Sequence, residues 1–151
     1  MQVISHRGLI EGEGEENSPY FIDAAINRGF YVEIDIRFIK GSFWLGHDTP
    51  DYRINLGWLE RRKDFLLLHC KNIEAAQEIA GLTFHFFCHS NEPYVLTSRN
   101  LLWVHDISLS LDESCIIPLI SKKDIENFDF SRKIRGICTD YPIYLDERFF
   151  S

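Results

Sequence analysis

The stretch YVEIDIRFIKGSFWLGHD, residues 31–48, decides the fold. Its first half alternates apolar side chains (Val32, Ile34 and Ile36) with charged ones (Glu33, Asp35 and Arg37). This period of two predicts a β-strand with both carboxylates on one face. Two neighbouring carboxylates raise each other's pKa, and burial raises it further, so that face needs a cation or a hydrogen-bonding partner. A half-exposed strand with a solvated acidic face is the alternative.

The chain before this strand predicts a βαβ unit. Residues 3–8, VISHRG, form a short apolar strand that brings His6 and Arg7 to a glycine turn. Ser18 and Pro19 are typical of the start of a helix, which we expect to run to Gly29. A strand, a helix and a second strand in this order place the two strands parallel.

Short polar motifs recur along the chain at the ends of predicted strands. In order they are HRG at 6–8, ENS at 16–18, E-x-D at 33–35 and HD at 47–48, with Lys71 and TDYP at 139–142 further on. Each motif alone is weak, but the ordered series resembles the glycerophosphodiester phosphodiesterase family.

The resemblance implies a (β/α)8 barrel, a fold that normally takes about 250 residues. The 151 residues here predict about eight strands, mostly parallel, with helices in the first half and tight connections in the second. We therefore expect one domain, residues 1–151: a compact (β/α)8 TIM-like barrel with several helices shortened or missing. Such a barrel exposes strand faces that helices would cover, so a homodimer is expected.

The resemblance also implies roles for five residues. His6 and His47 would be the acid and base of phosphodiester cleavage, one taking a proton and the other protonating the leaving oxygen. Arg7 and Lys71 would bind the phosphate, and Glu16 would orient Arg7. A core position for His6 and a solvated strand-end position for Lys71 are the alternatives.

A divalent metal is the expected cofactor, held by Glu33 and Asp35. The family usually has a third glutamate two residues before the lysine, but this chain has His69 there. Magnesium or calcium follows from the resemblance, whereas an imidazole ligand moves the preference toward manganese, iron or zinc. The substitution could also weaken the metal site.

The remaining histidines, His85, His89 and His105, have no counterpart in the motif series. We interpret them as strand-edge or core residues rather than as ligands.

Composition excludes several classes of partner. The net charge of −7 is unlike a nucleic-acid-binding or anionic-membrane surface, and no apolar run is long enough for membrane insertion. The four cysteines lie singly in apolar segments, without the spacing of a zinc or redox motif, and predict buried free thiols. With no basic segment before an apolar run at the N-terminus, a cytoplasmic location is expected.

These observations predict a metal-dependent phosphodiesterase acting on a small glycerophosphodiester-like substrate. One alternative is a lyase-like relative that stops at a cyclic phosphate. A different class is a catalytically inert barrel that binds a phosphorylated ligand or serves as an assembly partner.

Overall fold

The computed structural model describes residues 1–151, which form one ten-stranded mixed sheet and five short helices. Its parallel part runs in the order β6 (His85–Phe87), β5 (Leu66–Cys70), β2 (Tyr31–Ile39), β1 (Gln2–His6), β10 (Gly136–Thr139), β9 (Cys115–Pro118) and β8 (Leu102–Val104). The antiparallel strands β3 (Ser42–Leu45) and β4 (Tyr52–Ile54) extend β2 outward, and β7 (Tyr94–Leu96) pairs with β8.

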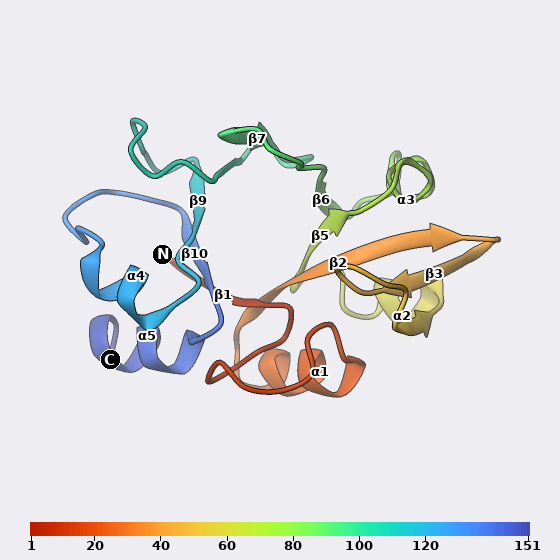
Figure 1. Cartoon of the computed structure of the whole chain (residues 1–151), viewed down its shortest axis with the longest axis horizontal. Coiled ribbons are helices and arrows are strands. Elements are labelled where there is room, and N and C mark those ends of the chain that lie inside the picture. The colour runs from red at the N-terminus through yellow and green to blue at the C-terminus, as the bar shows by residue number, and fades with distance from the viewer.

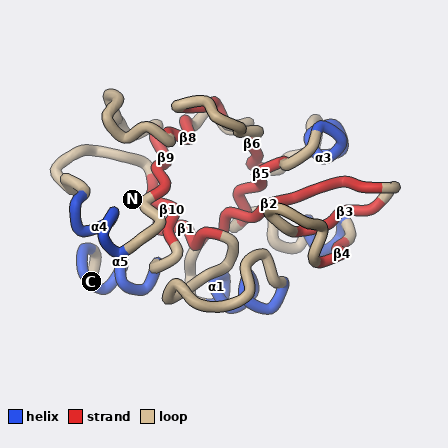
Figure 2. The backbone as a smooth tube through the Cα atoms, viewed as in Figure 1, coloured by secondary structure: helices blue, strands red, loops and turns tan.

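The sheet curls until its two ends approach each other, as the ring of strands in Figure 2 shows. No strand ladder joins β6 to β7 or β8. The junction is made instead by the chain after β7: the Ser98 N–H donates to the Phe86 carbonyl at 2.9 Å, and Thr97 Oγ1 lies 2.8 Å from His85 Nε2. The sheet is therefore curled but not closed by strand pairing.

The prediction of a (β/α)8 TIM-like barrel is wrong. The helices are α1 (Pro19–Asn27), α2 (Leu56–Glu60), α3 (Ile73–Ile79), α4 (Lys122–Asn127) and α5 (Pro142–Phe149), and none follows β6, β7 or β8 directly. Figure 1 shows the consequence: helices flank the two sides of the curled sheet and leave the region of β7 uncovered. The connections after β6 and β7, residues 88–93 and 97–101, are too short to carry a covering helix, because a crossover with its helix takes at least about 10–12 residues.

The uncovered strand β7 exposes Tyr94 and Leu96. The homodimer expected from such exposed faces remains a prediction.

The alternation predicted in β2 is confirmed. Val32, Ile34 and Ile36 are buried on the outer face, in a core shared with α1, α2 and α3. The opposite face of the sheet is also packed, by a cluster drawn from six strands: Ile4, Leu67, Phe87, Trp103, Ile116 and Cys138. This inner cluster forms an apolar floor within the curl, and Glu33 and Asp35 lie on the same inner face of β2.

Other sequence predictions are met in part. Helix α1 begins at Pro19 with Ser18 as its N-cap, and Gly29 follows it with a φ of 89°, a conformation that favours glycine. All four cysteines are free, but Cys88, predicted to be buried, is exposed just beyond β6. No helix is both long and apolar enough to cross a membrane.

Candidate active site

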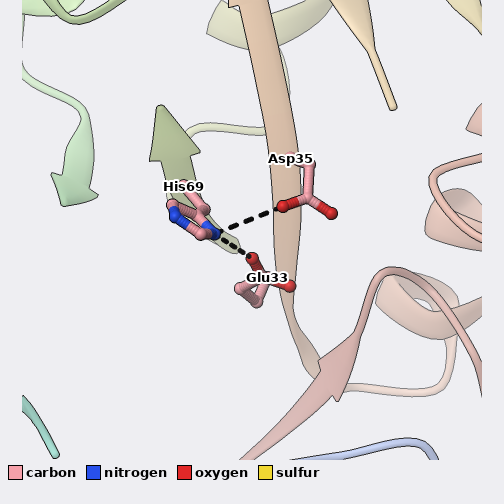
Figure 3. Close-up of side chains that lie close together, drawn as sticks. All are labelled: Glu33, Asp35 and His69. Carbon is pink, nitrogen blue, oxygen red and sulfur yellow. Dashed lines mark ion pairs between the residues drawn. The ribbon is translucent and has the colours of Figure 1, made fainter. Parts of the chain in front are cut away.

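Two carboxylates and one imidazole meet where β2 and β5 lie side by side. The pairing sets Asp35 directly opposite His69, and Glu33 is on the same face two residues earlier. His69 Nδ1 lies 3.2 Å from Asp35 Oδ1 and 3.7 Å from Glu33 Oε1 (Figure 3). One ligand atom from each residue fits within 4.8 Å of the others, which is the spacing of a cation site. The three residues predicted to hold a metal are thus together.

Two carboxylate oxygens in this cluster have no hydrogen-bond partner. Glu33 is 2 % exposed and Asp35 is fully buried, yet Glu33 Oε2 and Asp35 Oδ1 accept no hydrogen bond. A buried carboxylate oxygen left unpaired is costly, so these atoms suit a group that supplies positive charge. The residues present therefore fit a divalent cation.

The tautomer of His69 points to the same conclusion. Its Nε2 lies 3.2 Å from the backbone carbonyl of His89, a group that can only accept, so Nε2 carries the proton. Nδ1 is directed at Asp35 and Glu33: a proton on it would be donated to Asp35, and a cation that replaced this proton would be bound by the Nδ1 lone pair. A metal-binding histidine is commonly oriented in this way, by donating its other N–H to a carbonyl.

The two carboxylates have opposite electrostatic surroundings. Burial raises the pKa of Glu33, and the neighbouring charge of Asp35 raises it further. Burial also acts to raise the pKa of Asp35, but contacts with His69, Arg7 and Asn17 outweigh it and hold that pKa below its usual range. Asp35 is accordingly a fixed negative charge, whereas Glu33 is the carboxylate that most lacks a counter-charge.

Asp35 is held in place by residues of the HRG and ENS motifs. The Asp35 N–H donates to Asn17 Oδ1 at 2.9 Å, and Asn17 Nδ2 donates to Asp35 Oδ2 at 3.0 Å. Arg7 Nε lies 2.9 Å from the same Oδ2, although it is not aligned as a hydrogen bond, and Arg7 Nη1 donates to Glu16 at 2.8 Å. Arg7 and Asn17 both have positive φ angles, 54° and 61°, which ordinary residues adopt at a cost of about 1–3 kcal/mol. The backbone conformations of Arg7 and Asn17 therefore cost free energy, and they place the two side chains where they orient Asp35.

The contact of Glu16 with Arg7 matches the expected one, but Arg7 differs from a free phosphate clamp. Two carboxylates already occupy its guanidinium, so only part of its donor fork remains for a ligand.

His6, at the end of β1, faces Asp140, which follows β10. Its Nδ1 lies 2.7 Å from Asp140 Oδ1, and its Nε2 lies 3.9 Å from Glu33 Oε2. Burial lowers the pKa of His6, but the Asp140 hydrogen bond and the Glu33 charge outweigh burial and raise it above 6.5. Asp140 thus fixes the ring and leaves Nε2 toward the Glu33–Asp35–His69 cluster.

His47 reaches the site from the loop after β3. Its Nδ1 is 2.7 Å from Asp48 Oδ1, and its backbone carbonyl accepts a hydrogen bond from Arg37. It lines one cavity of about 310 Å³ with His6, Glu33 and His69. The two histidines predicted as acid and base therefore open onto one space.

The same cavity contains residues that the sequence interpretation set aside. His89 and His105 line it, with ring centroids 4.9 Å apart in a stacked arrangement. The sequence feature that could have identified them is their position just beyond the ends of β6 and β8, because His6 and Lys71 lie at the same edge of the sheet. His85, in contrast, is a buried core histidine as predicted.

Comparisons of the chain with models of protein families, with curated proteins and with solved structures find no match.

Proposed function

We propose that this protein is a metal-dependent phosphodiesterase that cleaves a small glycerophosphodiester-like substrate. The supporting observation is a buried Glu33–Asp35–His69 cluster with unpartnered carboxylate oxygens, opening onto the same cavity as His6 and His47. The ordered resemblance of the motifs to glycerophosphodiester phosphodiesterases gives the reaction class. The exposed and buried free thiols suit a reducing cytoplasm.

Glu33, Asp35 and His69 would hold the divalent ion, which supplies positive charge to a phosphate oxygen and lowers the pKa of a bound hydroxyl. Arg7 contributes a donor that its two carboxylate partners leave free, and Lys71 contributes a cation with no ion pair of its own within the protein. Phosphoryl transfer depends mainly on such positioned charge.

His6 and His47 would divide the proton transfers. One takes the proton from the attacking hydroxyl, and the other gives a proton to the leaving oxygen. Asp140 holds the His6 ring and favours its charged form, while Asp48 holds His47. If the attacking hydroxyl belongs to the substrate, proximity favours a cyclic phosphate as the first product.

The test is hydrolysis of glycerophosphocholine, followed by ³¹P NMR, with Mg²⁺ or Mn²⁺ and then with EDTA. We expect metal-dependent turnover, with losses of about 10²–10⁴-fold in His6→Ala and in His47→Ala. His85→Gln is the matched control, because this histidine lies outside the cavity and should leave turnover unchanged. A panel of small glycerophosphodiesters left intact by folded, metal-supplemented protein would reject the proposal and favour an inert, ligand-binding protein.

A further inference from the structure

Three hydrogen-bond donors in the cavity have no partner within the protein. The Lys71 ammonium forms no ion pair, the Ser90 hydroxyl forms no hydrogen bond, and neither ring nitrogen of His105 has one. The cluster that binds the metal does not require them, because its oxygens face His69 and His6 instead. These donors are therefore available to a ligand.

The donors lie where the cavity continues outward. Lys71, His89 and Ser90 line both the 310 Å³ cavity and an adjoining groove of about 540 Å³, which runs beside α3 past Ile73. A diester whose phosphate lies at the metal-binding cluster would direct one of its two alcohols along this path. Lys71 and Ser90, which line both spaces, would meet that alcohol, and Lys71 would do so in addition to its contact with the reacting phosphate.

The junction has a definite architecture. The His89 ring is anchored by Nε2, which donates to the Glu92 carbonyl at 2.8 Å, and it stacks on His105. The backbone N–H groups of His105 and Asp106 donate to the Pro93 carbonyl at 2.8 and 3.1 Å, so the two loops are fastened to each other. The stacked pair thus holds the His105 ring beside the donors contributed by the β5 and β6 ends.

Charge identifies the ligand. The only acidic side chain of the inner cavity is Glu33, which belongs to the Glu33–Asp35–His69 cluster, and only two of its twelve lining residues are hydrophobic. The one acidic residue of the outer groove, Glu92, accepts a hydrogen bond from the Ser90 N–H at 2.8 Å. An ammonium, a hydroxyl and an imidazole N–H together are donors for an oxyanion. We infer that Lys71, Ser90 and His105 bind a second anionic group, a phosphate or carboxylate, carried by the alcohol of the diester. This inference rests on the proposed function for the identity of the first phosphate.

The test compares two ligands that differ by one anionic group: glycerol 3-phosphate and 3-phosphoglycerate. Their dissociation constants are measured by calorimetry in excess Mn²⁺. Because neither compound is a diester, binding is measured without turnover. We expect 3-phosphoglycerate to bind wild type about tenfold more tightly, or better. In Lys71→Met and in His105→Gln that ratio should fall toward one. Lys133→Met, which removes an exposed charge outside the cavity, should keep the wild-type ratio.

Octyl phosphate is the competing ligand, because the outer groove includes four hydrophobic residues among its nine. Equal affinities of wild type for the first two ligands, a ratio that survives both cavity variants, or tighter binding of octyl phosphate than of 3-phosphoglycerate would each overturn the inference. Thermal melts show whether each variant is folded. Selective binding without any hydrolysis would reject the enzyme and keep the anion site, whereas hydrolysis without selectivity would do the reverse.

Discussion

The Glu33→Gln substitution should have opposite effects on stability without and with metal. It should be neutral or stabilising in EDTA, and it should leave the protein less stable than wild type once metal is added. In EDTA, the buried carboxylate of Glu33 has one oxygen without a hydrogen bond and lies near Asp35, and burial with the Asp35 charge outweighs the attraction of His6 and His69, so Glu33→Gln should melt at or above the wild-type temperature. A divalent ion at 100 times its dissociation constant adds about 2.7 kcal/mol to wild type. Since 1 kcal/mol corresponds to about 2–4 °C in a domain of this size, the wild-type melting temperature should rise by about 5–11 °C.

Differential scanning fluorimetry in EDTA and across Mg²⁺, Ca²⁺, Mn²⁺ and Zn²⁺ titrations measures both effects. Glu33→Gln should lose most of the metal-induced rise. Glu78→Gln is the matched control, because Glu78 is an exposed residue of α3 with no ion pair, and it should follow wild type. The reasoning is refuted if no metal shifts wild type, or if Glu33→Gln and Glu78→Gln gain the same number of degrees.

Three further outcomes follow from individual histidines and their partners. His69→Ala should weaken metal binding strongly, whereas His69→Glu should shift preference toward Mg²⁺ or Ca²⁺; indistinguishable affinities for both variants and wild type would mean that His69 only packs there. Asp140→Asn removes a cause of the raised pKa of His6, so the His6 limb of the pH dependence of kcat/KM should move to lower pH, and an unmoved limb would contradict the pairing. Burial, with a smaller effect of Arg99, lowers the pKa of His85 to about 4. The unfolded chain binds a proton at His85 near pH 6.5, whereas the folded chain does so only near pH 4. His85 alone should therefore lower the free energy of unfolding, measured in urea, by about 3 kcal/mol between pH 7 and pH 4. His85→Gln should make this fall measurably smaller.

The sequence predicted which residues come together better than it predicted the fold. The alternation around Glu33 and Asp35 and the motif order were enough to foresee that His6, Arg7 and His69 would converge, because the ends of neighbouring parallel strands meet at one edge. The strand period is a local property that the sequence shows directly. The convergence of strand ends needed only neighbouring parallel strands, which the curled sheet shares with the expected barrel, and the place of His69 in the cluster came from the family resemblance.

The barrel prediction failed because it depended on an assumption about the second half of the chain. Residues 84–118 contain strand signals without room for crossover helices, and β7 turns back as an antiparallel partner of β8 instead of continuing a parallel series. Whether the ends of a curled sheet pair is set by contacts between residues far apart in sequence, such as Phe86 with Ser98, which no local pattern encodes. The same limitation hid His89 and His105, since their stacking across this junction requires the curl.

The hydrogen bond from His69 to the His89 carbonyl links the loop of residues 88–93 thermodynamically to the Glu33–Asp35–His69 cluster. Whatever stabilises residues 88–93 in their present position also stabilises the His69 tautomer whose Nδ1 faces the carboxylates. By reciprocity, a cation bound at that Nδ1 would reduce the loop's excursions by the same free energy. Adding metal should therefore slow amide hydrogen exchange in this loop. The exchange rates would report that the ion is bound, although the loop's backbone groups do not contact it.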